Sequence, residues 1–298
     1  KIGIRVSSMI FCPPAPCLRL YWTARVDRCK SPWRRRLTAG RDYVSDAPTS
    51  MAMGGRRTRE TPLSRELMSQ PTPLRIFIGY DRREDTAYRV CAASLARRAR
   101  RPVAITPLIQ DSLRARGLYT RPVDPLASTE FTYTRFLTPY LAGFEGWALF
   151  CDCDFLWLDD VGALFDLADP QYAVMCVHHD HRPRETIKMD GAQQTVYPRK
   201  NWSSLMLFNC GHTANAVLTP ALVNHESGAF LHRLQWLDDD VIGAVPETWN
   251  WLEGWSPKPA EGTPKAVHYT RGGPWFENWR DVDYADLWQR EAAELDRD

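Results

Sequence analysis

Two acidic residues, Asp152 and Asp154, stand one residue apart in the segment WALFCDCDFLWLDD, residues 147–160. They directly follow residues 147–151, a continuous apolar run typical of a buried parallel strand. Open α/β sheets bind ligands beyond the carboxyl ends of their strands, so both carboxylates are expected at a binding edge. Their oxygens suit a hard divalent cation and leave coordination positions for water and a diphosphate. The spacing therefore favours a metal–diphosphate site; the alternative is that the two acids end the strand and cap the next turn.

A distant histidine, His268, is the candidate third ligand. It follows the apolar pair Ala266-Val267, as a ligand at the end of a strand would. A single histidine more often has a structural role. The paired acids and the glycine-rich segment after His268 nevertheless favour metal ligation by this imidazole.

A second group of histidines, His178, His179 and His181, lies in the segment CVHHDH. Zinc binding is the alternative for this group. It is disfavoured because adjacent side chains on a strand diverge and because Arg182 and Arg184 repel a cation. We expect this loop to border the acceptor substrate instead.

Residues 197–209, YPRKNWSSLMLFN, are expected on the same acceptor side. Four of them, Lys200, Asn201, Trp202 and Ser203, stand just before a predicted strand, where they could bind sugar hydroxyls. Trp202 would offer a flat face on which a sugar ring stacks.

Three further residues are candidates for binding a nucleotide. The first predicted strand ends at Tyr80 and Asp81, and its tip should lie beside the nucleotide. Tyr80 could stack on a base and Asp81 could accept hydrogen bonds from it, although Asp81 is equally suited to cap the helix that begins near Glu84. Arg135 could neutralise diphosphate charge as a bidentate donor; otherwise it is a surface helix residue.

Strand and helix signals alternate along the chain. Apolar β-branched runs predict strands at 74–80, 103–108, 147–151, 172–177 and 204–209. Helical spacing follows residue 81 and recurs at 135–141 and 218–236. This alternation predicts an α/β protein with a mostly parallel central sheet flanked by helices. The tail from Glu247 holds six of the 12 tryptophans and is predicted to be an ordered, irregular wrap, since exposed aromatics at that density would aggregate.

Charge divides the chain into two parts. Residues 1–68 hold 14 Lys/Arg against 5 Asp/Glu, a net charge of +9, and show no sustained periodicity. We expect them to be disordered, and to precede a natural start at Met68, with Met51 and Met53 as the alternatives. Residues 69–298 hold 24 Lys/Arg against 31 Asp/Glu, a net charge of −7, and are expected to form one domain. An acidic domain argues against a nucleic-acid partner.

Cysteine usage and hydropathy bear on location. Five cysteines lie beyond residue 68, mostly in apolar runs and without C-x-x-C spacing, which predicts free buried thiols in a reducing compartment such as the cytoplasm. No apolar run approaches the roughly 18 residues that cross a bilayer, so a transmembrane segment is not expected, whereas peripheral membrane association stays compatible with the sequence.

Five motifs in the same order make residues 74–279 resemble the nucleotide-sugar glycosyltransferases of the GT-A (Rossmann-like) fold, most of all retaining family 8. The motifs are a D-x-D preceded by a helix Arg, F-N-x-G, a D-Q-like pair, W-N, and a His-Tyr-x-x-Gly-x-Pro-Trp run. The matching residues are Arg135, Asp152, Asp154, Phe208–Gly211, Asp238, Asp239, Trp249, Asn250, His268, Tyr269, Gly272, Pro274 and Trp275.

The resemblance implies a role for each motif. Asp152, Asp154 and His268 would hold Mn²⁺ or Mg²⁺. Asn209 and either Asp238 or Asp239 would contact the donor sugar and act in catalysis. Arg271, beside Gly272, would replace the family's phosphate-binding lysine, which this chain lacks.

The implied activity is transfer of a sugar from a nucleotide diphosphate, with UDP favoured, to a glycan or another hydroxyl acceptor. Three alternatives stay open. A sugar nucleotidyltransferase shares the metal carboxylates but usually begins with a glycine-rich phosphate loop, which GYDRRED lacks. A nucleotide-sugar hydrolase would need no acceptor, and a non-catalytic carbohydrate-binding protein would not need the three metal ligands.

Overall fold

The computed structural model of the protein describes residues 72–124, 127–180, 199–295 and 297. All of them belong to one compact unit, Glu60–Asp298. Residues 1–68, expected to be disordered, lie outside the described residues, as does His181 of the histidine segment. None of the helices in the described ranges is long and apolar enough to cross a membrane.

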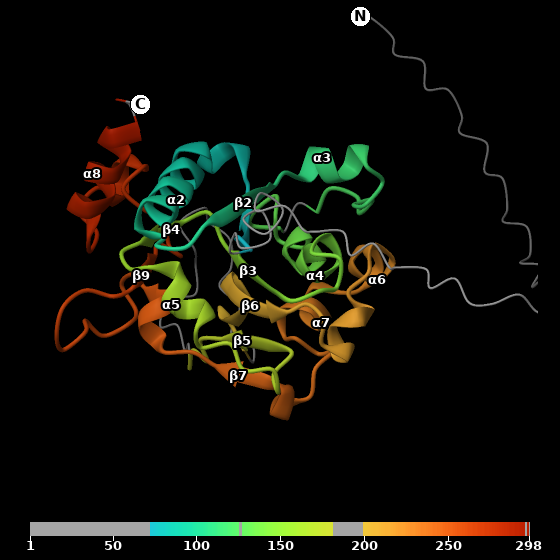
Figure 1. The fold of residues 1–298 in the computed structure, drawn as a ribbon. Coiled ribbons are helices and arrows are strands. Elements are labelled where there is room, and N and C mark those ends of the chain that lie inside the picture. The colour runs from blue at the N-terminus through green and yellow to red at the C-terminus, as the bar shows by residue number, and fades with distance from the viewer. Residues whose placement is uncertain (1–71, 125–126, 181–198, 296, 298) are drawn as a thin grey trace, which may run out of the picture. The chain divides into compact units, whose positions relative to one another are not determined.

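A six-stranded sheet forms the centre of the unit (Figure 1). Its strands, in spatial order, are β2 (Val103–Leu108), β1 (Leu74–Gly79), β3 (Trp147–Cys151), β6 (Leu205–Asn209), β5 (Val174–Cys176) and β7 (Ile242–Ala244). β6 runs antiparallel to both of its neighbours, whereas the other neighbouring pairs are parallel. The predicted α/β class with a mostly parallel central sheet is confirmed.

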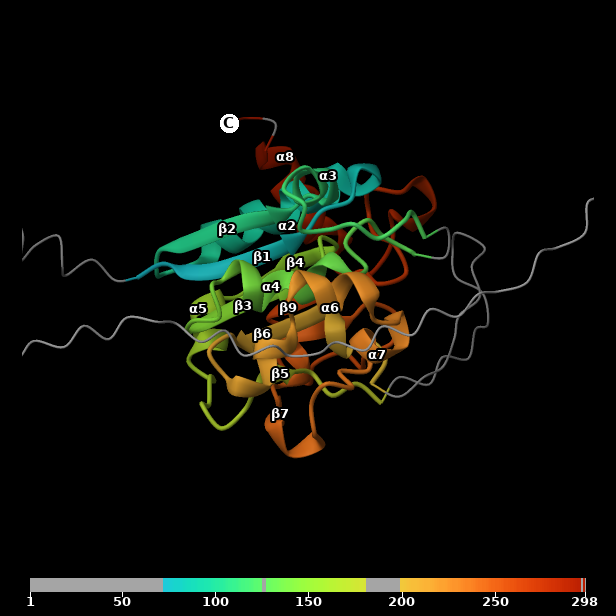
Figure 2. The ribbon, with the colours of Figure 1, turned by 90° about the vertical axis from the view of Figure 1, so that its right-hand side faces the viewer.

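Helices cover the sheet on two sides. In Figures 1 and 2, α2 and α8 lie on one side and α4, α6 and α7 on the other. The helices are α2 (Asp85–Arg98), α3 (Gln110–Ala115), α4 (Thr138–Leu141), α5 (Val161–Phe165), α6 (Pro220–His225), α7 (Gly228–His232) and α8 (Ala285–Leu295). The buried residues of α2 are those of the predicted apolar stripe, namely Ala87, Val90, Cys91, Ser94 and Leu95.

Two predicted helices differ in form. The segment 135–141 is a 3₁₀ turn, Thr134–Leu137, that continues into α4, because Pro139 at the start of α4 cannot donate a backbone hydrogen bond to a preceding turn. The segment 218–236 contains α6 and α7, separated at Glu226 and Ser227, where the side chain of Ser227 caps α7.

The tryptophan-rich tail is more regular than expected. It forms a second sheet in the order β4 (Phe155–Trp157), β9 (Ala266–His268) and β8 (Trp251–Leu252), and it ends in α8. Trp249, Trp251 and Trp288 are buried, which fits the expectation that these aromatics are covered. A strand of two residues is too short to show a period in the sequence, so β8 could not be found there, whereas β9 is the strand end expected at Ala266-Val267.

The cysteines of the described residues pack as small apolar side chains. All five are free and buried: Cys91, Cys151, Cys153, Cys176 and Cys210. Burial raises the pKa of Cys151, Cys153, Cys176 and Cys210, which keeps these thiols protonated and unreactive.

Asp81 fixes the turn that follows β1. Its side chain is fully buried and accepts hydrogen bonds from the backbone and guanidinium of Arg83 at 2.7–3.0 Å and from the backbone N–H of Glu130 at 3.1 Å. Burial by itself would raise the pKa of Asp81, but the hydrogen bonds from Arg83 and Glu130 outweigh burial and hold its pKa below the usual value. Asp81 therefore caps the helical turn that begins at Arg82, which is one of the two roles expected for it.

We expect Asp81→Asn to lower the free energy of unfolding by about 1–3 kcal/mol near pH 7, because an amide cannot accept all of these bonds. A carboxylate with a lowered pKa stabilises the fold above its unfolded pKa of about 3.9, and the contribution is lost as the pH falls through the folded pKa. The difference between variant and wild type should therefore shrink near pH 3. Urea unfolding at both pH values measures it.

Asp111→Asn is the matched control, because Asp111 pairs with Arg82 on the surface with 67% of its side chain exposed. This change should alter the free energy of unfolding by less than about 0.5 kcal/mol. If Asp81→Asn lowers the free energy of unfolding by the same amount near pH 3 as near pH 7, the charge of Asp81 is not the cause of the loss.

Candidate metal centre

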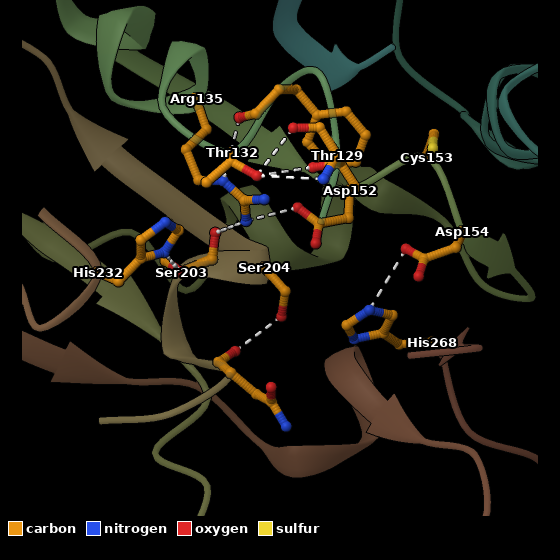
Figure 3. Close-up of polar contacts among 12 residues, drawn as sticks. Thr129, Thr132, Arg135, Asp152, Cys153, Asp154, Ser203, Ser204, His232 and His268 are labelled. Carbon is orange, nitrogen blue, oxygen red and sulfur yellow. Dashed lines mark hydrogen bonds and ion pairs between the residues drawn. The ribbon is translucent and has the colours of Figure 1, made fainter. Parts of the chain in front are cut away.

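Asp152, Asp154 and His268 converge at one edge of the central sheet (Figure 3). Each offers one ligand atom, and these atoms lie within 4.8 Å of one another. The antiparallel pairing of β4 with β9 sets Phe155 opposite His268, so Asp154, which precedes β4, meets the imidazole at the end of β9. The distance from His268 Nε2 to Asp154 Oδ1 is 3.3 Å. Pairing of strands far apart in sequence thus brings the three predicted ligands together.

Arg135 lies directly against this group. Its Nη1 is 2.7 Å from Asp152 Oδ1 and donates to the backbone oxygen of Ser203 at 2.9 Å. The side chain is buried, and its guanidinium lies 5.2 and 5.1 Å from the ring centroids of Phe131 and Phe150, which are themselves in contact. Arg135 is therefore a buried partner of the acid pair and not a surface helix residue.

The two carboxylates have opposite electrostatic surroundings. Burial raises the pKa of Asp152 to about 7 and the charge of Asp154 adds to this, although Arg135 opposes it. Asp154 has a lowered pKa, because the charge and hydrogen bond of His268 outweigh the effect of burial. The pKa of His268 is raised by Asp154 against the opposing effect of burial. Protons and nearby cations are therefore needed to stabilise these groups when no metal ion is bound.

The donor set fits a divalent cation. The Oδ1 atoms of Asp152 and Asp154 are buried and make ion-pair contacts, yet neither accepts a hydrogen bond of normal geometry. Two carboxylate oxygens and one imidazole nitrogen suit Mn²⁺ or Mg²⁺ and leave further coordination positions open. Cys153 points the other way, as expected: it is buried and its Sγ donates to Glu84 Oε2 at 3.5 Å.

The turn before β6, residues 199–204, supports the site from a second direction. The backbone oxygen of Ser204 accepts from the backbone N–H of Asp152 at 2.9 Å, and that of Ser203 accepts from Arg135. Asn201, in the same turn, has a left-handed backbone with φ of 64°. Sequence analysis placed Ser203 on the acceptor side and missed Ser204, because the contacts of both residues depend on which end of β6 lies beside β3.

Asn209 lies at the end of β6 that is remote from Asp152. β6 is antiparallel to β3, so Asn209 pairs with Trp147 at the start of β3, about 13 Å along the strand from its end. The Asn209 side chain donates to the backbone oxygens of Pro170 and Tyr172. A role for Asn209 at the donor sugar stays a prediction.

Asp238 and Asp239 are exposed residues at the start of a 3₁₀ turn, Asp239–Val241. Asp239 forms an ion pair with Arg199, which also donates to the backbone oxygens of Arg233 and Leu234. None of the contacts among the described residues joins either acid to Asp152, Asp154 or His268. A catalytic role for Asp238 or Asp239 stays a prediction.

The remaining nucleotide candidates have different environments. The hydroxyl of Tyr80 donates to Asp85 at 3.0 Å, and its ring packs edge-on against Tyr88. Stacking of a base on Tyr80 stays a prediction. The carboxylate of Asp81 is committed to Arg83 and Glu130, so nucleotide binding by Asp81 would require these bonds to break.

Arg271 stands three residues after His268, within a turn in which Gly272 N–H donates to Tyr269 O. Its Nη2 is 3.1 Å from Glu253 Oε2, and its guanidinium lies 5.0 Å from the ring centroid of Trp279. Its Nε is buried and lacks a hydrogen-bond partner. A phosphate-binding role for Arg271 and Gly272 stays a prediction.

The acceptor-side candidates form a cluster around Trp202. Its ring stacks on His178 with a centroid distance of 4.0 Å, and its Nε1 donates to the backbone oxygen of His179 at 3.1 Å. One face of Trp202 is therefore covered by His178, which leaves less of the ring for a sugar than expected. Lys200, two residues before Trp202 in the chain, is buried. The acceptor roles of His179, Lys200, Asn201 and Trp202 stay predictions.

No family model matches the chain. Among solved structures, GlyE of Streptococcus pneumoniae TIGR4, a glycosyltransferase, is 16% identical with a TM-score of 0.49, over 74% of this chain and 60% of that one. The bifunctional glycosyltransferase WbbM is 17% identical with a TM-score of 0.47, over 74% of this chain and 50% of that one. The galactosyltransferase LgtC, in complex with donor and acceptor sugar analogs, is 12% identical with a TM-score of 0.47, over 74% of this chain and 96% of that one. The chain thus spans about half of WbbM and three fifths of GlyE.

A curated relative is much more similar in sequence. Protein CDI of Arabidopsis thaliana is 57% identical over 233 residues, which make up 77% of this chain and 90% of that protein. The chain therefore belongs to the family of Protein CDI of Arabidopsis thaliana.

Proposed function

We propose that the protein is a metal-dependent glycosyltransferase that moves a sugar from a nucleotide-diphosphate donor, with UDP favoured, to a hydroxyl of a glycan or another acceptor. The observation that carries this proposal is the convergence of Asp152, Asp154 and His268 at the edge of the sheet. The motif resemblance to family 8 supports it and is the reason to expect retention of anomeric configuration. The buried, free cysteines support a reducing compartment such as the cytoplasm.

Charge explains why this group suits a diphosphate. With His268 neutral, Asp152, Asp154 and Arg135 together carry one net negative charge. A bound divalent cation reverses this to one net positive charge, which attracts the diphosphate of the donor. Bound there, Mn²⁺ or Mg²⁺ would supply Lewis-acid stabilisation of the charge on the departing nucleotide.

The protein's own residues orient that chemistry. Arg135 contacts Asp152 directly and packs against two aromatic rings, so it can keep that carboxylate in place. Arg271 has a buried Nε without a partner, a donor that an approaching phosphate oxygen could satisfy. The cluster around Trp202 stands next to Ser203 and Ser204, so an acceptor bound there would reach the site from the side of β6.

A hydrolase acting on the same donor is the second candidate, because it would use the same carboxylates and imidazole. Donor turnover measured with and without a panel of sugar acceptors separates the two. Acceptor-dependent release of the nucleotide supports a transferase, and release that no acceptor changes supports the hydrolase. Tight sugar binding without turnover supports a non-catalytic binding protein.

We expect Asp154→Asn to reduce metal-dependent donor turnover by about 10³-fold, because the variant loses an anionic ligand worth several kcal/mol to the transition state. Nucleotide release with Mn²⁺, and with a chelator added, measures this effect. Asp159→Asn is the matched control, since Asp159 pairs with Lys265 at a half-exposed position after β4. Its turnover should match the wild type. Full turnover in Asp154→Asn with an unchanged melting temperature would contradict the metal role.

Gly254→Ala tests the role of Arg271. Gly254 has φ of 71°, and a Cβ there would lie 1.9 Å from Arg271 Nη2, so the guanidinium must move. We expect the KM for the donor to rise about tenfold, equivalent to about 1.4 kcal/mol of binding. Initial rates over a range of donor concentrations give this value.

Gly262→Ala controls for backbone strain, because Gly262 has φ of 70° and nothing within 4 Å of the added Cβ. This variant should keep the wild-type KM. Equal KM values in Gly254→Ala, Gly262→Ala and the wild type would argue against phosphate binding by Arg271.

A further inference from the structure

A chain of three hydrogen bonds runs from the imidazole of His268 to a backbone carbonyl. His268 Nδ1 is 2.9 Å from Asn250 Oδ1, and Asn250 Nδ2 donates to Ser204 Oγ at 2.9 Å. Ser204 Oγ in turn donates to the backbone oxygen of Asn201 at 2.7 Å. His268, Asn250 and Ser204 are all at least 95% buried, so water does not compete for these bonds.

The direction of each bond follows from the carbonyl end. A backbone oxygen can only accept, so the single hydrogen of Ser204 Oγ is used on Asn201. Ser204 Oγ must then accept from Asn250, which turns the amide NH₂ of Asn250 toward Ser204 and its oxygen toward His268. His268 Nδ1 therefore carries the hydrogen.

This direction decides which nitrogen of His268 can bind a metal ion. A neutral imidazole with its hydrogen on Nδ1 has its lone pair on Nε2, the atom that faces Asp154 Oδ1 at 3.3 Å. Phe155 stacks on the ring with a centroid distance of 4.4 Å and an interplanar angle of 16°, which keeps the ring in this plane. In the other tautomer, Nε2–H would donate to Asp154, and the nitrogen would have no lone pair to offer.

We propose that Asn250 and Ser204 are positioning residues that hold His268 in the Nδ1–H form and so present the Nε2 lone pair to the metal ion. This inference rests on the proposed function, in which His268 is a ligand. Ser204 also accepts from the backbone N–H of Asp152. One residue of the turn before β6 therefore aligns two of the three ligands.

The test uses three variants of the full chain. Asn250→Leu removes the acceptor for Nδ1–H, and Ser204→Ala removes the group that orients the amide. Asn250→Asp restores an acceptor. The histidine tautomer is read from ¹⁵N imidazole shifts in the metal-free protein at alkaline pH, with the His268 signals assigned from a His268→Gln variant. Mn²⁺ affinity is read from a titration of each variant.

We expect the wild type and Asn250→Asp to have the Nδ1–H tautomer and similar Mn²⁺ affinities. Asn250→Leu should change to Nε2–H, because Asp154 becomes the only acceptor beside the ring, and should bind Mn²⁺ about 10- to 100-fold more weakly. Ser204→Ala should have an intermediate loss of affinity, because the amide of Asn250 is then free to turn.

Asn215→Leu is the matched control. Asn215 is also fully buried and bonds to the backbone oxygens of Ala173 and Asn209, beyond the other end of β6. Its loss should lower the melting temperature without changing the His268 tautomer or the Mn²⁺ affinity. An equal loss of affinity in Asn215→Leu and Asn250→Leu would reduce Asn250 to a structural residue and overturn the proposal.

The positioning role of Asn250 and the metal role of His268 are tested by separate measurements. An unchanged tautomer in a folded Asn250→Leu variant overturns the positioning role of Asn250, whatever the metal affinity. Absence of Mn²⁺ binding in the wild type overturns the metal role of His268, and the tautomer of the wild type then shows whether the hydrogen-bond chain has the direction assigned to it.

Discussion

Two carboxylates buried side by side are the constraint around which this part of the protein is organised. Asp152 and Asp154 cannot both be charged at the sheet edge unless positive charge lies close to them. Arg135 is in contact with Asp152 and His268 with Asp154, so each acid has its own partner. The carboxylate oxygens of the two acids can still coordinate a cation, which is the basis of the function proposed above.

Secondary structure from three separate parts of the chain holds this arrangement. The end of β3 supplies the acids, the small sheet of β4, β9 and β8 supplies the imidazole, and the turn before β6 supplies backbone oxygens. Because β4 begins directly after Asp154, the strand pairing that builds the second sheet also sets the distance from Asp154 to His268. The folding of the tryptophan-rich tail therefore also sets the geometry of the site.

The turn before β6 has the strongest coupling to the site. Ser203 and Ser204 contact Arg135, Asp152 and Asn250 through backbone and hydroxyl oxygens. The same turn carries Trp202, which stacks on His178. A change in the position of Trp202 would therefore be transmitted to Arg135 and Asp152 through bonded neighbours.

The sequence by itself determined the α/β class, the buried stripe of α2, and the identity of the three converging ligands, because apolar periodicity and side-chain chemistry are local properties. Tertiary structure alone decided which end of β6 reaches the site: an apolar run predicts a strand but not its direction, and the antiparallel pairing with β3 brings Ser204, not Asn209, beside Asp152. The roles of Asn250 and Ser204 were equally hidden, since a hydrogen-bond chain between residues 46 positions apart exists only after β8 and β6 have been brought together. The local sequence pattern indicates which side chains can take part in chemistry, and the pairing of strands far apart in the chain determines which of them lie together.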